Sequence, residues 1–270
     1  MSLVSVIIPV KDRVLPLKRA IESVKKQSHR NIEVIIVENN SKSPPKIKAA
    51  IEDMGDPALK FFSLSSCDNA NVARNYGISK ASGDYLAILD SDDEFFPTHI
   101  EDCLKLLTES CCDFVFGSIY LDDGASKIAR YSRNLTFGES GIEYLFGKNA
   151  GWAPTPTYFL RKEVTTNVVW DENLRRHQDF DFFIRVVSKY RVIAKKEPSV
   201  VVHWKKGEKR TYDSSSMRIF YDKWRSKMGL IEKISYSKNK VRIAILNRDM
   251  HNLAFFTLEY FKAKICAYFK

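Results

Sequence analysis

Residues 81–94 read ASGDYLAILDSDDE, a short apolar run that ends in a cluster of carboxylates. The run over 85–89 has the length and composition of a buried strand. The acidic residues begin directly where this strand should end. Ligands of open α/β sheets bind outside the carboxyl ends of strands, so this stretch predicts both a fold and a site.

Strand and helix signals alternate on either side of this stretch. Strands are predicted over 4–10, 32–37, 60–64, 85–89 and 114–119, and helices over 15–26, 44–51, 70–79 and 97–107. Such alternation predicts a mostly parallel sheet with helices on both faces. Further along, the sequence predicts a short helix over 138–146, a helix over 178–189 and a strand over 192–202 that contains Pro198. Residues 120–175 are otherwise less regular.

Length and composition fit one large domain, or one domain with an appendage, because the chain has 270 residues of which 44% are hydrophobic. Its five cysteines form no Cys-x-x-Cys pair, which argues against a disulfide scaffold or a zinc finger. We find neither a signal peptide nor an apolar run of about 18 residues. The expected location is therefore cytoplasmic.

The net charge of +10 lies entirely in the last quarter of the chain, where 205–270 carry 16 Lys and Arg against 6 Asp and Glu. We therefore divide the chain into 1–204 and a basic C-terminal extension, 205–270. Apolar residues recur in this extension near helical spacing, at Leu246, Met250, Leu253, Phe256, Phe261, Ile265 and Phe269. This pattern predicts an amphipathic helix that lies on an anionic membrane, or packs on the protein's own core or a second subunit.

The acidic run Asp90-Ser91-Asp92-Asp93 favours a divalent cation, because three carboxylates in four residues repel one another. Mg²⁺ is commonly held by one or two carboxylates together with substrate phosphates. A solvated turn before a helix is the alternative. A calcium loop is disfavoured because Phe95 stands where that loop needs glycine. Neither a P-loop nor a Gly-x-Gly-x-x-Gly motif is present, so a nucleotide would rely on metal and on side chains such as Lys11, Arg13 and Arg74.

Four stretches in this order resemble family 2 glycosyltransferases: SVIIPVKDR at 5–13, VENNS at 37–41, ARNYG at 73–77, and 81–93. The resemblance covers about residues 3–205. It implies a GT-A fold, with a Rossmann-like central sheet flanked by helices, here followed by the C-terminal helical extension. It also implies inverting transfer from a nucleoside-diphosphate sugar with Mn²⁺ or Mg²⁺.

The resemblance also assigns roles to individual residues. The residues expected to line the nucleoside pocket are Pro9, Val10, Asp12, Glu38 and Asn40. Arg74 and Asp90 would hold base, ribose or phosphate. Asp92 would bind the metal directly, with Asp90 beside it and Asp93 as a helper.

Inverting transfer needs a general base for the acceptor hydroxyl, which the family takes from an acidic pair at the start of a late helix. Gln178 stands in the first position of that pair and Asp179 in the second, so Asp179 is the predicted base. A carboxylate that merely stabilises the helix N-terminus is the alternative. Asp181 faces away on a helix and is expected to cap the helix or to form an ion pair, with Arg185 as the candidate partner.

Three further positions carry weaker expectations. His203, at the end of a strand, would complete the metal site or touch the diphosphate. The cations that follow it, Lys205, Lys206 and Arg210, would contact the diphosphate or simply begin the basic extension. Trp152 would stack on the acceptor sugar, with core packing as its alternative.

The leading interpretation is an inverting, metal-dependent hexosyltransferase that moves galactose or glucose from a UDP-sugar to a glycan or lipid-pyrophosphate-linked acceptor, in O-antigen or capsule assembly. It would lie on the inner face of the cell membrane, and a homodimer is compatible with the extension. Two alternatives are a catalytically weak GT-A partner subunit, favoured by Gln178, and a nucleic-acid-binding protein acting through the extension. Nucleic acid is not the expected partner, because it explains neither the acidic run nor the motif order.

Overall fold

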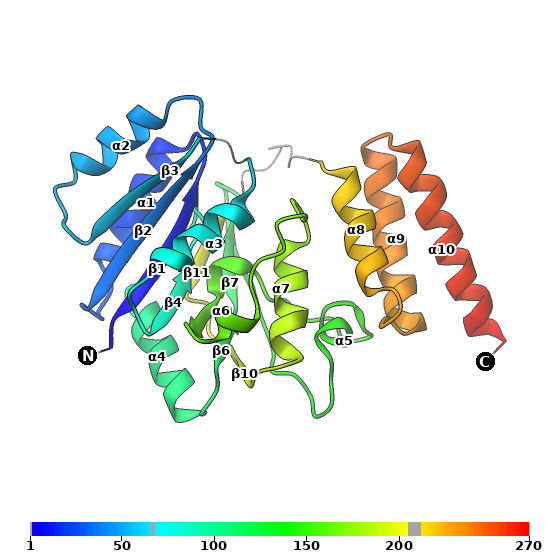
Figure 1. The fold of residues 1–270 in the computed structure, drawn as a ribbon. Coiled ribbons are helices and arrows are strands. Elements are labelled where there is room, and N and C mark those ends of the chain that lie inside the picture. Colours follow the sequence, from blue (N-terminus) through cyan, green and yellow to red (C-terminus); the bar gives the residue numbers. More distant parts are fainter. Residues whose placement is uncertain (1, 66–67, 205–211, 270) are drawn as a thin grey trace.

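The computed structural model describes residues 2–65, 68–204 and 212–269, and Figure 1 shows a central sheet with helices on both faces. The seven-stranded sheet has the order β10-β6-β9-β4-β1-β2-β3. Its strands are β1 (Val4–Val10), β2 (Ile32–Asn39), β3 (Leu59–Leu64), β4 (Tyr85–Ile88), β6 (Phe114–Gly117), β9 (Phe159–Arg161) and β10 (Val192–Lys195). Neighbouring strands are parallel except that β9 runs antiparallel to β4 and β6. The predicted mostly parallel α/β sheet is confirmed.

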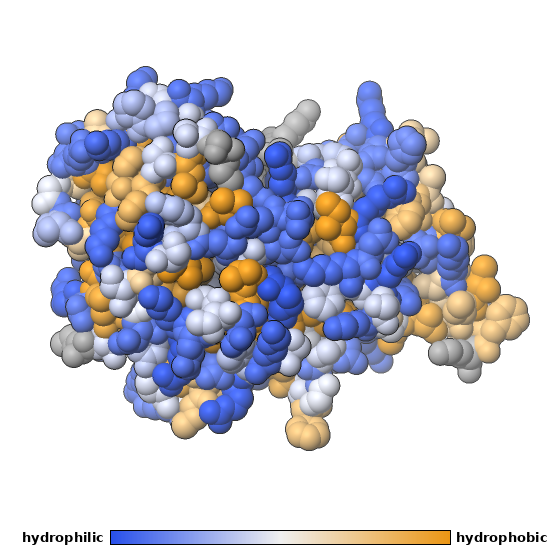
Figure 2. All heavy atoms as spheres, in the orientation of Figure 1, coloured by the Kyte–Doolittle hydropathy of each residue, from blue (hydrophilic) through white to orange (hydrophobic). Residues whose placement is uncertain are grey.

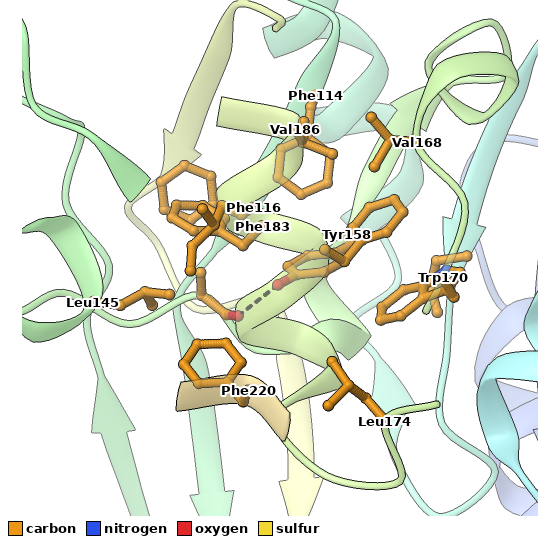
Figure 3. Packing of buried hydrophobic residues seen from close by; sticks show 14 of the residues in the cluster. Phe114, Phe116, Leu145, Tyr158, Val168, Trp170, Leu174, Phe183, Val186 and Phe220 are labelled. Carbon is orange, nitrogen blue, oxygen red and sulfur yellow. Dashed lines mark hydrogen bonds between the residues drawn. The ribbon is translucent and has the colours of Figure 1, made fainter. Parts of the chain in front are cut away.

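The sheet separates two apolar cores, because successive side chains of a strand point to opposite faces. Val6 and Ile8 of β1 face one core, and Ile7 faces the other. The first core is covered by α1 (Val14–Lys25), α2 (Pro44–Glu52) and α4 (His99–Glu109). The second is covered by α3 (Ala70–Lys80), α5 (Gly141–Phe146), α6 (Val164–Asn167) and α7 (Gln178–Val187). Figure 3 shows its aromatic centre, where Tyr158 lies beside Phe114 and Trp170.

Helix α3 lies unusually close to the sheet. A Cβ atom on its Gly77 would stand 2.7 Å from a methyl carbon of Ile7 in β1 and 3.1 Å from Val37 in β2. Only glycine permits this approach without displacing the strands. The contact fixes α3 against β1 and β2, and Arg74 of this helix reaches Asp90 after β4.

A second, four-stranded sheet has the order β5-β11-β7-β8. Its members are β5 (Glu94–Phe95), β7 (Ile119–Asp122), β8 (Lys127–Arg130) and β11 (Val200–His203), and the short turn η1 (Thr155–Thr157) precedes β9. This sheet gives a regular structure to much of the stretch after residue 118, where the sequence shows little periodicity. It brings His203 to the segment that follows the acidic run.

Two predicted strands are wrong in extent, because in each of them the chain passes from one sheet to the other. The expected strand over 192–202 is two strands, β10 in the large sheet and β11 in the small one, separated by the segment that contains Pro198. Proline lacks the N–H that a sheet ladder needs. The expected strand over 114–119 likewise divides into β6 and β7. In both places the chain leaves one sheet and enters the other.

The C-terminal extension forms three helices that stand side by side beyond α7 in Figure 1: α8 (Ser214–Trp224), α9 (Leu230–Leu246) and α10 (Met250–Tyr268). The helix predicted from Leu246 to Phe269 is present as α10, but Leu246 belongs to α9, because the chain turns at Arg248, whose φ is +54°. The Asp249 side chain then caps α10 by accepting the Asn252 N–H. Phe256 is buried in the second core, whereas Phe261, Ile265 and Phe269 are exposed. The division at 204/205 stays a prediction.

Candidate functional site

The predicted nucleoside residues gather at the carboxyl ends of β1 and β2, where two non-glycine residues adopt left-handed backbone. Asp12 has φ +55° and Asn40 has φ +59°. Such conformations cost about 1–3 kcal/mol and concentrate at functional sites. The two turns are tied together, because the Ser41 hydroxyl accepts the Asp12 N–H at 3.0 Å and Asp12 Oδ1 accepts the Lys42 N–H at 2.6 Å.

Glu38, at the end of β2, is completely buried. One of its carboxylate oxygens accepts the Ser41 N–H, and the other accepts the Ser63 hydroxyl from β3. Pro9 and Val10 belong to the neighbouring strand β1, in register with Val37 and Glu38. Glu38 therefore holds the turn that carries Asn40 and Ser41, and its place in the nucleoside pocket stays a prediction.

Arg74 joins α3 to the acidic run. Its side chain is only 2% exposed, and Nη2 donates to Asp90 Oδ1 at 2.6 Å. The guanidinium lies over the Trp170 ring, 4.8 Å from its centroid, and Nη1 donates to Asn71. Among the described residues its Nε finds no hydrogen-bond partner. A buried, charged donor with spare capacity at the mouth of a sheet is suited to an anionic ligand.

Asp92 is held by two arginines from the start of the chain. Arg13 Nη1 lies 2.5 Å from Asp92 Oδ2, and Arg19 donates to the Asp92 carbonyl oxygen at 2.6 Å. Asp93 beside it is buried and accepts the backbone N–H of His203 at 3.1 Å. Burial, together with the charges of Asp90 and Asp92, raises the pKa of Asp93 well above its ordinary value. The carboxylates of this turn therefore repel one another, although Arg13 and Arg74 pair with two of them.

His203 does not point its ring at the other predicted metal ligands. Its Nε2 lies 2.6 Å from Glu94 Oε1, and its Nδ1 lies 3.7 Å from Asp122 Oδ2. Within the described ranges, no group of three or more His, Cys, Asp and Glu side chains is arranged to hold an ion. Only the backbone of His203 adjoins the acidic run, through Asp93. The other expected diphosphate contacts, Lys205, Lys206 and Arg210, lie outside the described residues.

Asp179 lies in the first turn of α7, with its carboxylate accepting the Phe180 N–H at 3.0 Å. Burial raises the pKa of Asp179, Arg74 lowers it and Asp90 raises it further. The charges of Arg74 and Asp90, two predicted nucleotide ligands, therefore act on the pKa of Asp179, the predicted base. Gln178 has a buried amide oxygen without a partner among the described residues.

Asp181 has a different role, as its position on α7 predicts. It is fully buried, and Arg185 donates to its Oδ2 at 2.8 Å. Its Oδ1 accepts the Trp224 indole N–H at 3.0 Å and lies 2.8 Å from Lys223 Nζ. The expected pairing with Arg185 is confirmed, and Asp181 also fastens α8 of the extension to α7.

Trp152 is 45% exposed, so the core-packing alternative is wrong for this residue. The next residue, Ala153, offers its carbonyl oxygen to the Tyr158 hydroxyl, which also lies 3.1 Å from the Asp179 carbonyl oxygen. The loop that carries Trp152 is thus joined to the start of α7 through one side chain. Its contact with an acceptor sugar stays a prediction.

Several contacts of the site escape sequence reasoning. Lys11 pairs with Asp68, which follows β3, and Arg19 reaches across to Asp92. Lys240 of α9 contacts His177 beside the predicted base. No local signal marks these pairs, because their partners lie tens of residues apart and each looks like an ordinary surface charge.

Known proteins resemble this chain in sequence and in fold. The family model for glycosyl transferase family 2 matches residues 5–171. The amylovoran biosynthesis glycosyltransferase AmsB of Erwinia amylovora is 31% identical over 189 residues, which are 67% of this chain and 62% of the relative. WcaA of Escherichia coli K12, whose name assigns it to colanic acid biosynthesis, is 27% identical over 248 residues, with 86% of this chain and 84% of the relative covered.

Among solved structures, TarS of S. aureus in complex with UDP-GlcNAc superposes with a TM-score of 0.67 at 19% identity. The superposition covers 96% of this chain and 73% of that one. At this identity the likeness concerns the fold, and it establishes the GT-A architecture. Together with a family model that spans 5–171, these likenesses identify the chain as a member of glycosyl transferase family 2.

Proposed function

We propose that this chain is an inverting, metal-dependent glycosyltransferase that moves a hexose from a UDP-sugar to a saccharide acceptor. The observation that carries the proposal is that Arg74, which pairs with Asp90 at 2.6 Å, lies over the Trp170 ring, and that this ring stacks on Phe182 of α7, the helix that carries Asp179. The buried guanidinium of Arg74 is suited to an anionic sugar nucleotide, and the Asp179 carboxylate is suited to act as base toward an acceptor hydroxyl. Both groups therefore lie at the same end of the sheet. The names of AmsB and WcaA support an acceptor in bacterial polysaccharide assembly.

The residues present fit a divalent cation. Burial and the charges of Asp90 and Asp92 raise the pKa of Asp93, while Arg13 lowers it, so the carboxylates of this turn repel one another even beside this arginine. Asp92 and Asp90 would hold Mn²⁺ or Mg²⁺, with diphosphate oxygens as further ligands, as Mg²⁺ prefers. A bound cation would neutralise charge on the departing diphosphate. His203 would have to leave Glu94 before it joined this set.

The chain's own residues would carry the proton transfer. Asp179 would take the proton of the acceptor hydroxyl as that oxygen attacks the anomeric carbon from the face opposite the diphosphate. Burial makes the Asp179 carboxylate a stronger base than an exposed aspartate. Attack from the opposite face inverts the anomeric configuration. Trp152, exposed on the adjoining loop, would stack on the acceptor sugar.

The acceptor would be linked to a lipid pyrophosphate, and α10 would lie against an anionic membrane surface. The exposed apolar side chains of α10 include Leu258, Phe261 and Ile265, and the exposed Lys262 and Lys264 lie between these residues in the sequence. Figure 2 shows apolar side chains gathered at the C-terminal end of this helix. Apolar and basic side chains on one exposed helix complement a lipid interface. No helix of the described chain is long and apolar enough to cross a bilayer.

The proposal is tested by calorimetric titration with UDP, GDP, CDP and ADP, with and without Mn²⁺. We expect metal-dependent binding of UDP in preference to the other three nucleotides. UDP-glucose and UDP-galactose would then be screened with saccharide acceptors, and NMR of the product would give its anomeric configuration. If the folded protein binds none of the four nucleotides, the proposal fails, and the partner-subunit and nucleic-acid alternatives take its place.

Asp92→Ala tests the metal assignment. Loss of the ligand should remove several kcal/mol of transition-state stabilisation, which corresponds to about 100-fold or more in kcat. UDP binding without metal should stay unchanged. Asp53→Ala, which alters an exposed aspartate at the end of α2, is the matched control and should behave like the wild type. Undiminished metal-dependent turnover by Asp92→Ala would place the cation elsewhere.

A further inference from the structure

Helix α9 of the extension sends a lysine into the protein beside the predicted base. Lys240 is only 5% exposed, and its Nζ lies 2.6 Å from Nε2 of His177. His177 is the residue directly before α7, and its φ of +61° places it in the left-handed region. Its side chain makes no capping hydrogen bond to the helix. Contacts from other elements must therefore hold this unfavourable backbone conformation.

Those contacts come mainly from the extension. The His177 ring stacks on Phe220 of α8, with centroids 5.3 Å apart, and lies 5.8 Å from the Tyr236 ring of α9. Lys240 Nζ lies 4.6 Å from the centroid of the same Tyr236 ring. The imidazole is thus enclosed by aromatic rings, with one polar contact, the Lys240 amine, at its Nε2.

The charge of this pair favours a neutral imidazole. Burial and the cations Lys240 and Arg176 lower the pKa of His177 well below its ordinary value. Burial lowers the pKa of Lys240 to about 7, and the charge of Asp179 opposes this fall. Among the described residues, no carboxylate lies within ion-pair distance of Lys240 Nζ. Nε2 of His177 and the Lys240 amine therefore share one hydrogen bond in which either group can donate, while Nδ1 has no hydrogen-bond partner among the described residues.

We propose that Lys240 is a positioning residue for glycosyl transfer, whose contact with His177 holds the first turn of α7 and with it the Asp179 carboxylate. This role rests on the proposed function of Asp179 as the base. It makes the C-terminal extension part of the catalytic apparatus, although the extension lies outside the part of the chain that the family model matches. A misplacement of about 1 Å at a reacting group can cost about 100-fold in rate.

Lys240→Met is the decisive variant, because methionine nearly matches the length of lysine but neither donates to His177 nor carries charge. Methionine removes the cost of burying the amine but leaves Nε2 of His177 without a partner, so the two effects on stability oppose each other. We expect a melting temperature within a few degrees of the wild type, a UDP dissociation constant within about twofold of the wild type, and a kcat about 10- to 100-fold lower. Lys238→Met, on an exposed position of the same helix, is the matched control and should retain wild-type kcat.

A second measurement does not depend on turnover. The imidazole ¹⁵N shifts of His177 should differ between the wild type and Lys240→Met, because the variant removes the hydrogen-bond partner of Nε2. Lys240→Gln, which keeps a donor without the charge, should recover part of the kcat and of the wild-type shifts. It also serves if the methionine variant fails to fold.

The outcomes separate the two claims. A wild-type chain that neither binds UDP nor turns over overturns the proposed function, and the role of Lys240 with it. An active wild type with an equally active Lys240→Met overturns only the positioning role. A variant that loses melting temperature, UDP affinity and kcat together would show a purely structural lysine, and also overturns it.

Discussion

Arg74 illustrates how one residue can serve both fold and site. Its guanidinium is buried against Trp170 and paired with Asp90, so α3, the acidic run and the segment before α7 are held around one charge. Arginine suits this position because its planar fork can stack and pair at once. The spare Nε donor gives the same residue a further point of contact for an anion.

The residue-scale prediction concerns Asp179. Asp179→Asn cannot accept the acceptor proton, so transfer should fall by about 100- to 10,000-fold. UDP binding should be retained, because the amide is isosteric and Arg74 and Asp90 are unaltered. Asp222→Asn, an exposed aspartate on α8, is the control. Full activity of Asp179→Asn would assign the base to another group.

The pH dependence of the wild type gives a second check on Asp179. Burial and the charge of Asp90 raise its pKa above the ordinary value of 3.8. The base must be deprotonated to act, so kcat should fall as pH decreases, with a midpoint above 3.8. A pH-independent kcat down to pH 4 would contradict the assignment.

At the scale of elements, short polar contacts fix the positions of helices relative to their neighbours. Apolar packing alone fixes these positions less narrowly, because it is not directional. Asp181 fastens α8 to α7 through Trp224, and His99 fastens α4 to the small sheet by a 2.8 Å contact of its Nδ1 with the Ser199 hydroxyl. His99 also stacks on Phe95 of β5, with centroids 4.2 Å apart. Both groups are buried, so breaking either contact leaves an unpaired polar atom, which costs about 1–3 kcal/mol.

The element-scale prediction follows from the burial of His99. Burial lowers its pKa from 6.5 to about 3, so the unfolded chain binds this proton at a higher pH than the folded chain does. This contribution to stability is complete above about pH 6.5 and is lost as pH falls toward 3, at about 1.4 kcal/mol per pH unit. Urea unfolding at pH 7 and pH 5 should therefore show a smaller loss of stability for His99→Gln than for the wild type.

His29 provides the control for this measurement. Its ring lies at the surface and contacts a backbone carbonyl oxygen of the N-terminal segment. His29→Gln should leave the pH dependence of unfolding close to that of the wild type. Equal slopes for wild type and His99→Gln would mean that the pKa of His99 is the same in the folded and the unfolded chain.

At the scale of the whole molecule, the extension combines two kinds of surface. Phe220, Tyr221, Tyr236 and Phe256 of α8, α9 and α10 complete the core above α7, whereas the outward side of α10 is apolar and exposed. Removing residues 241–270 would therefore strip core residues as well as the outer face. Point substitutions on α10 separate the two roles.

Phe261→Glu combined with Ile265→Glu is the whole-molecule prediction. Both side chains are 56% exposed, so folding should survive, while co-sedimentation with phosphatidylglycerol vesicles should fall at least about tenfold. Leu15→Glu, which alters an exposed apolar residue on α1, should bind vesicles like the wild type. Unchanged vesicle binding, with loss of a dimer in sedimentation analysis, would show that a second copy covers this face.

The sequence by itself determined the sheet and the strand-end turns. Apolar runs such as 4–10 and 85–89, each followed by polar residues, indicate a buried strand followed by a loop. This signal can be read from the sequence because it depends only on residues that are neighbours along the chain. Asp12, Asn40, Asp90 and Asp92 could be placed at one edge because parallel strands end there together. The pairing of Asp181 with Arg185 also follows from helical spacing.

Only the tertiary structure decided the contacts between distant segments. The presence of Pro198 does not reveal that the segments on either side of it enter different sheets. The ring of His203 turns to Glu94, and the amine of Lys240 reaches His177, across 109 and 63 residues. Side-chain periodicity reports which face of an element is buried, but not which distant side chain that face meets. The partner of Lys240 is decided by how the helices of the extension pack on α7. Burial makes such polar contacts selective, because a buried polar atom without a partner costs free energy.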